Sequence, residues 1–120
     1  MEKDIAFKKL PVIDWGQSSR LAGQNDSLAK EILGILIKDL PSDLAALHEL
    51  DQIKNYHELQ RRVHKLHGAV CYTGTPRLKM LLAQLETHLK NHIMDDLPSL
   101  LNQLDIEIHL LLEHYSRLSV

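Results

Sequence analysis

Histidine is unusually frequent in this sequence. Eight occur in 120 residues, against a single cysteine, Cys71, and an imidazole can serve as metal ligand, general base or nitrogen nucleophile. On a helix, His57, His64 and Cys71 would share one face, with His67 one turn beyond His64. Gly68 would lie beside His64, although a glycine within a helix costs about 1 kcal/mol relative to alanine. This pattern indicates an imidazole that a second molecule approaches closely.

Other uses of these side chains compete with that interpretation. His67 has the same chemistry as His64, but its angle lies closer to the apolar side of the helix and its spacing to a glycine differs. His88 and His92 are four residues apart, and such a pair on one helix can bind Zn²⁺. No HExxH or cysteine-rich spacing accompanies them, so a solvated face is favoured. Cys71 is better explained as a small neutral filler than as a redox switch.

Helical periodicity predicts the elements that position these residues. Apolar residues recur at steps of three and four along almost the whole chain, which predicts helices at about 14–22, 25–50, 55–74, 75–89 and 95–118. Pro41 lies inside the second of these and favours a kink. In the third, His64 points roughly 120° away from the centre of the apolar stripe, at about 100° per residue. We therefore expect His64 to face solvent.

The predicted helix starts carry capping residues. Asp14 is expected to cap the short helix, and Asn55 with Glu58 has the spacing of a capping box. Thr75 followed by Pro76 suits the start of the fourth helix, and Asp95 is expected to open the last one.

Length and composition define the class of protein. A chain of 120 residues is one domain, and four long helices with short connections predict an all-α fold, an antiparallel four-helix bundle with a short extra N-terminal helix. Residues 1–12 are expected to form an irregular arm and residues 13–120 the bundle domain. The net charge of −2 argues against a nucleic-acid binder. The apolar runs are too short for a membrane span or signal peptide, and one cysteine fits a reducing compartment.

The segment His64-Lys65-Leu66-His67-Gly68, followed by Gly74, resembles the motif of histidine phosphotransfer (HPt) domains. The wider stretch 63–79 is similar, more specifically, to the C-terminal HPt domain of BarA/GacS-type hybrid sensor histidine kinases. The resemblance covers about residues 12–118 and implies a four-helix bundle, in agreement with the periodicity.

The resemblance implies a function in a two-component phosphorelay. His64 would be the phosphoacceptor, taking a phosphoryl group from a receiver-domain aspartate of a hybrid sensor kinase and passing it to a response-regulator aspartate. His67 stands where the family commonly has lysine, and it would stabilise the phosphoryl group either as a cation or as a neutral hydrogen-bond donor. The partner is expected to cover His57, Arg61, Lys65, Gly68 and Cys71.

No cofactor or metal of its own is implied, because the receiver supplies Mg²⁺. The isolated domain is expected to be a monomer without ATP-dependent kinase activity. The resemblance also implies that it lies in the cytoplasm, as the C-terminal domain of an inner-membrane sensor kinase, without direct membrane contact. The alternative is a helical adaptor module with no chemistry, which would have no need of Gly68 on the face of His64.

Overall fold

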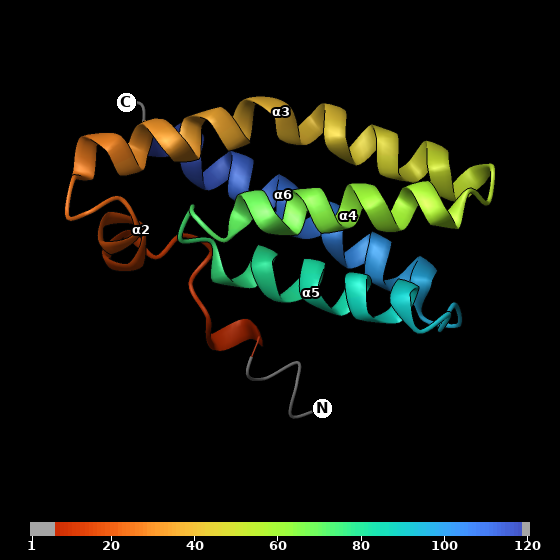
Figure 1. Cartoon of the computed structure of the whole chain (residues 1–120). Coiled ribbons are helices and arrows are strands. Elements are labelled where there is room, and N and C mark those ends of the chain that lie inside the picture. The colour runs from red at the N-terminus through yellow and green to blue at the C-terminus, as the bar shows by residue number, and fades with distance from the viewer. Residues whose placement is uncertain (1–6, 119–120) are drawn as a thin grey trace.

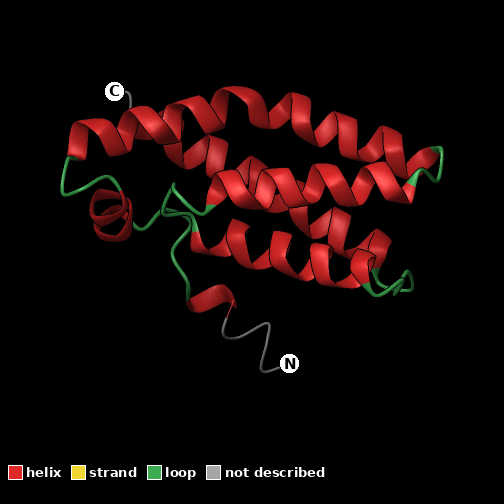
Figure 2. Ribbon diagram, viewed as in Figure 1, coloured by secondary structure: helices red, strands yellow, loops and turns green. Residues whose placement is uncertain are grey.

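The computed structural model describes residues 7–118 and, within them, contains helices joined by short loops and no strand (Figures 1 and 2). After a short helical turn at residues 7–9 come α2 (Trp15–Leu21), α3 (Asp26–Gln52), α4 (Tyr56–Val70), α5 (Pro76–Lys90) and α6 (Leu97–Leu118). The predicted all-α class is confirmed. Half of the predicted N-terminal arm lies outside the described residues.

Helices α3 to α6 alternate in direction and form the antiparallel four-helix bundle that periodicity predicted (Figure 1). Helix α2 is seen nearly end-on in Figure 1, at the end of the bundle where α3 begins and α4 ends. The core is almost wholly aliphatic because the sequence has few aromatic residues. Among the described residues, no helix has both the length and the apolarity needed to cross a membrane.

Side-chain caps fix the starts of α2, α3 and α4. Asp14 Oδ1 accepts a hydrogen bond from the Gln17 N–H at 3.0 Å, as predicted, and Asn55 Oδ1 accepts one from the Glu58 N–H at 3.3 Å. The predicted capping box is only half formed. The carboxylate of Glu58 accepts from Arg61 instead, at 2.8 Å, because the Asn55 N–H already donates to a backbone carbonyl of the preceding turn.

Two other helix boundaries differ from the sequence expectation. Helix α6 begins at Leu97, and its first-turn hydrogen bond runs from the Leu100 N–H to the Asp96 carbonyl, so Asp95 does not open it. Thr75 precedes α5 as predicted but makes no side-chain cap, because its hydroxyl bonds to that of Thr73 at 2.8 Å. Helix α3 continues through Pro41 as a single element.

Gly74 fastens α2 to the loop between α4 and α5. Its φ of +64° favours glycine, and a Cβ there would lie 2.7 Å from both the backbone nitrogen and the Cβ of Ser18. The Gly74 carbonyl accepts a hydrogen bond from the Asp14 N–H at 2.8 Å. A side chain at this position would therefore separate α2 from the bundle.

One buried ion pair joins α5 to α6. Arg77 Nε lies 3.1 Å from Glu107 Oε1, and the Glu107 side chain is almost fully buried. Burial raises the pKa of Glu107, and the Arg77 guanidinium opposes that shift without cancelling it. The guanidinium also lies 4.5 Å from the ring centre of Phe7, a cation–π distance that ties residue 7 to the bundle.

Candidate functional site

Helix α4 presents His64 to solvent, as its periodicity predicted. Its buried residues are Leu59, Val63, Leu66 and Val70, which step by four, three and four and so form one stripe facing the core. The side chain of His64 lies on the other side of the helix and is 76% exposed. An imidazole held this far out on a rigid helix is accessible to a second macromolecule.

Glu86, on the neighbouring helix α5, connects the two histidines of the motif. Its Oε1 bonds to Nδ1 of His64, and its Oε2 bonds to Nδ1 of His67 at 2.8 Å. The side chains of His67 and Glu86 are 25% and 21% exposed, so this carboxylate lies behind the exposed ring of His64 and partly out of water.

The charge of Glu86 follows from these contacts. Burial raises the pKa of its carboxyl, but the hydrogen bonds from His64 and His67 and the attraction to both rings outweigh burial and lower the pKa overall. Glu86 is therefore a carboxylate at neutral pH.

Gly68 leaves an open patch beside His64. It lies within α4 with an ordinary helical backbone, and a Cβ built on it would meet no described atom within 4 Å apart from its chain neighbours and the nearby backbone of α4 itself. Nothing inside the described part of the chain therefore demands glycine here, in contrast to Gly74.

The other residues predicted for partner binding lie around His64. His57, Arg61 and Lys65 are exposed on α4, and Arg61 forms an ion pair with Glu58 at 2.8 Å. Cys71 is half-buried at the C-terminal end of α4 and lines neither of the hollows described below.

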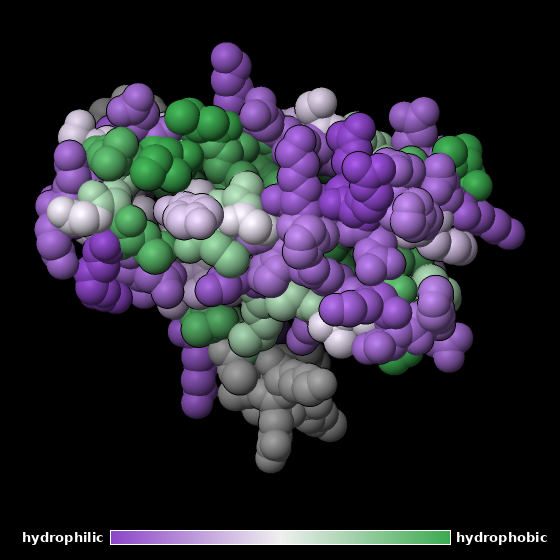
Figure 3. Space-filling view, viewed as in Figure 1, coloured by the Kyte–Doolittle hydropathy of each residue, from purple (hydrophilic) through white to green (hydrophobic). Residues whose placement is uncertain are grey.

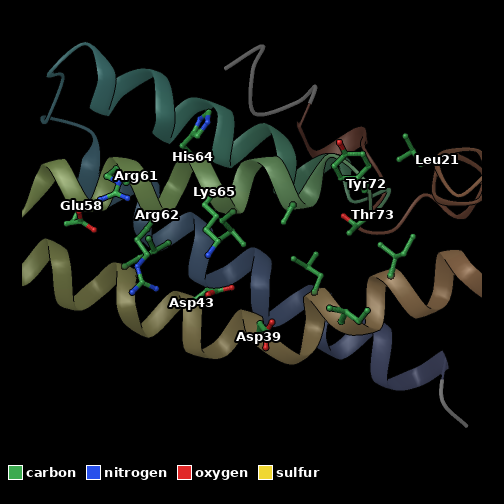
Figure 4. A pocket seen from close by; sticks show the side chains of 16 residues that line it. Leu21, Asp39, Asp43, Glu58, Arg61, Arg62, His64, Lys65, Tyr72 and Thr73 are labelled. Carbon is green, nitrogen blue, oxygen red and sulfur yellow. Dashed lines mark hydrogen bonds and ion pairs between the residues drawn. The ribbon is translucent and has the colours of Figure 1, made fainter.

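A groove of about 960 Å³ runs between α3 and α4 up to His64 (Figure 4). Figure 4 shows Glu58, Arg61 and Arg62 at one end and Leu21 and Tyr72 at the other. The apolar end lies in the half of the molecule where Figure 3 shows hydrophobic surface over α2 and the start of α3. Its exposed apolar side chains are Leu21, Ile35 and Tyr72.

A smaller hollow, of about 430 Å³, lies on the α5 side of His64. His64 lines both hollows and so stands on the ridge between them. Lys90 lines this second hollow and makes no ion pair with any residue in the range 7–118. The hollow therefore places a fixed positive charge near the exposed imidazole.

Sequence reasoning missed both Glu86 and Lys90, although a signal for Glu86 was present. In an antiparallel hairpin, residues at equal distances from the connecting loop lie opposite each other. His64 and Glu86 stand eleven residues before and after Thr75, which lies in the loop between α4 and α5. A carboxylate at that mirrored position is the natural partner of the exposed histidine.

The histidine pair considered for a metal does not share a helix. Helix α5 ends at Lys90, and His92 has a positive φ of 57° in the turn beyond it, so the expected placement of both rings on one helical face is wrong. Among residues 7–118, no three His, Cys, Asp or Glu side chains are arranged to hold a metal ion.

Together, the fold and the site define a four-helix bundle that presents the exposed imidazole of His64, backed by the carboxylate of Glu86. Residues 31–114 match the Hpt domain family, and the chain belongs to that family. The resemblance noted from the His64-to-Gly68 motif is thereby confirmed.

Similar proteins support the family assignment. The chain is 35% identical over 104 residues to the signal transduction histidine-protein kinase BarA of Escherichia coli K12, which covers 85% of this chain and 11% of BarA. It is 35% identical over 81 residues to the sensor protein GacS of Pseudomonas syringae pv. syringae, covering 68% of this chain and 9% of GacS. The chain thus spans about a tenth of the length of these relatives.

A solved structure shares the fold. The HPT domain of a sensor hybrid histidine kinase from Shewanella superposes with a TM-score of 0.81 at 25% identity, covering 89% of this chain and 92% of that one. Hpt domains carry phosphoryl groups in phosphorelays, and those of hybrid kinases pass them between receiver domains and response regulators.

Proposed function

We propose that His64 is the phosphoacceptor of this domain, receiving a phosphoryl group from a receiver-domain aspartyl phosphate and passing it to a response-regulator aspartate. The observation that carries this proposal is the exposed ring of His64, bonded through Nδ1 to Glu86 and standing beside the open patch at Gly68. With Nδ1 engaged, Nε2 is the ring nitrogen available to a partner.

The transfer needs little chemistry from this domain. The lone pair of Nε2 attacks phosphorus, the bond from phosphorus to the aspartyl oxygen breaks, and the receiver recovers its carboxylate. The second transfer runs the same exchange toward another aspartate. Catalysis of phosphoryl transfer rests mainly on positioning and on stabilisation of charge. The domain contributes no cofactor, and the Mg²⁺ that neutralises the phosphoryl oxygens comes with the receiver.

His67 and the surrounding cations assist in this scheme. His67 lies one turn from His64 and stabilises the phosphoryl group, while Lys90 adds a fixed charge at the same ridge. A hydrogen bond to a charged group contributes about 1.5–3 kcal/mol. Loss of His67 should therefore slow the reaction without abolishing it.

The partner docks over the exposed face of α4. In this proposal it covers His57, Arg61, Lys65 and Gly68, reaches the edge of Cys71, and extends an apolar surface into the groove between α3 and α4. The apolar end supports this proposal because exposed hydrophobic patches commonly mark protein–protein contacts.

We also propose a setting for the domain. We place it in the cytoplasm, as part of a hybrid sensor kinase with a receiver domain and a response regulator as partners, monomeric when isolated and without nucleic-acid or membrane contact. Its similarity to parts of BarA and GacS supports that setting.

The test is a labelling assay with a phosphorylated receiver domain. Wild-type protein should gain one phosphoryl group that is labile in acid and stable in base. His64→Ala should gain none, and His67→Ala should be labelled about ten- to a hundredfold more slowly.

The control is His114→Ala, because His114 is exposed on α6 and its hydrogen bond among residues 7–118 is to Leu110 of the same helix. It should be labelled at the wild-type rate. Labelling of His64→Ala with none in His67→Ala would assign the nucleophile to His67, and no labelling of wild type by any receiver would favour an adaptor module.

A further inference from the structure

One carboxylate contacts two histidines, in each case through the ring atom Nδ1. Glu86 meets Nδ1 of His64 with one oxygen and Nδ1 of His67 with the other, the second at 2.8 Å. The two histidines are separated by one helical turn of α4, and the carboxylate comes from α5, so the fold itself sets this arrangement.

The chemistry of the contact determines where the ring protons are. An ionised carboxylate only accepts hydrogen bonds, whereas a neutral imidazole has one N–H donor and one bare nitrogen acceptor. A bare Nδ1 facing a carboxylate oxygen would place two acceptors against each other. Both contacts therefore require a proton on Nδ1. The lowered pKa of Glu86, which two histidine hydrogen bonds produce against the effect of burial, keeps it ionised across the pH range where imidazoles titrate.

We propose that Glu86 is the positioning residue of this site, a shared acceptor that holds His64 and His67 in the same Nδ1–H tautomer. This inference rests on the proposed function of His64 and deepens it. In that tautomer, Nε2 of neutral His64 keeps its lone pair for attack on phosphorus. After the attack the Nδ1 proton stays on the ring, and Glu86 balances the positive charge of the phosphorylated imidazole.

The contact with Glu86 also determines how His67 can stabilise the phosphoryl group. Its neutral form has one N–H, which Glu86 occupies, so the Nε2 that remains for a phosphoryl oxygen is a bare acceptor. His67 therefore donates to the phosphoryl group only as an imidazolium. The choice left open by the sequence, between a cation and a neutral donor, is settled by Glu86 in favour of the cation.

Glutamine and glutamate differ at this position in a way that can be measured. A glutamine side chain has one acceptor oxygen and one donor NH₂ group. Because each ring faces a different terminal atom of residue 86, glutamine in the same position can accept from only one of the two rings. In Glu86→Gln, one histidine should keep its Nδ1 proton and the other should change to the Nε2–H tautomer. In Glu86→Ala, neither ring should be constrained.

The experiment is ¹⁵N NMR of the histidine rings in the unphosphorylated full chain, at a pH high enough for the imidazoles to be neutral. Wild type should show Nδ1–H for both rings, Glu86→Gln for one, and Glu86→Ala a tautomer mixture for both. Glu113→Ala, which removes a carboxylate paired with Arg117 on α6, is the control and should match wild type. An Nε2 proton on either neutral ring of wild type, or unchanged tautomers in Glu86→Ala, would overturn the proposal.

Rates of labelling from a phosphorylated receiver give the functional readout. Glu86→Ala should be slower by about ten- to a hundredfold, the effect of one charge-assisted hydrogen bond. Glu86→Gln should be labelled at close to the wild-type rate if its His64 keeps the Nδ1 proton, and more slowly if it does not. A rate that does not follow the His64 tautomer across the three proteins would contradict a positioning role. The NMR result needs no phosphoryl transfer, so it separates failure of this inference from failure of the proposed function.

Discussion

Substitution of Gly68 should change stability and phosphoryl transfer in opposite directions. Gly68 has helical backbone geometry and its missing Cβ would meet no atom within 4 Å, so the full propensity difference should appear. Gly68→Ala should stabilise the domain by about 1 kcal/mol. For a chain of this length, that corresponds to a rise in melting temperature of roughly 3–5 °C. Gly68→Gln should stabilise it somewhat less.

Transfer should respond to the size of the new side chain. The phosphorus must come within about 3–3.5 Å of Nε2 of His64, and a misplacement of about 1 Å can cost a hundredfold in rate. Alanine adds one methyl group, so Gly68→Ala should slow transfer by less than about tenfold. Glutamine extends further over the patch, so Gly68→Gln should slow it by about a hundredfold or more.

Circular dichroism melting and receiver labelling on the same samples provide the assay. A lower melting temperature for Gly68→Ala would show that the fold itself requires this glycine. Wild-type transfer rates in folded Gly68→Gln would show that no partner covers this face.

The remaining predictions concern the other glycines, the buried ion pair and the groove. Gly74→Ala should lower stability by at least about 2 kcal/mol, because residue 74 has a positive φ and a Cβ there would clash with Ser18. Gly23→Ala is the comparison: its φ is +70° but the space around it is open, so it should lower stability by only about 1 kcal/mol. Equal losses in thermal unfolding would contradict the close packing at Gly74. Arg77→Ala should lower the free energy of unfolding by about 3–5 kcal/mol at pH 8, and by less at pH 5, as measured by urea unfolding. Burial already raises the pKa of folded Glu107 above its ordinary 4.5, so ionisation of Glu107 destabilises the fold as pH rises, and more strongly when Arg77 is absent. A loss of stability that is independent of pH would refute this reasoning. Ile35→Asp should raise the receiver concentration needed for half-maximal transfer about tenfold or more, because Ile35 lines the groove. Ile106→Asp on α6 is the control and should leave this concentration unchanged, since Ile106 is similarly exposed (54%, against 62% for Ile35) but does not line the groove.

The fold and the exposure of His64 could be predicted because each follows from local periodicity. The apolar steps along residues 56–70 fix which side of α4 faces the core, and His64 falls on the opposite side whatever the neighbouring helices are. The same reasoning placed α3 as one helix through Pro41, since its apolar residues keep their phase across the proline.

Features that depend on contacts between distant segments could not be predicted in this way. Glu86 reaches His64 and His67 only because α4 and α5 pack antiparallel in one register, which the periodicity of either helix leaves free. The role of Gly74 depends on Ser18, more than fifty residues earlier in the chain. The end of α5 was predicted to within a residue, but the positive φ of His92, a residue other than glycine, was not.

The order in which the helices pack has a consequence for how the domain folds. Within residues 7–118, every packed pair of helices is adjacent in the sequence, apart from α3 with α6. Such low contact order is typical of helical bundles that fold within microseconds to milliseconds. Because joining α3 to α6 closes the longest loop, we expect it to come late. The hairpin of α4 and α5 contains His64, His67 and Glu86, so the geometry around the reactive nitrogen is encoded within residues 56–90 and can form before the bundle closes.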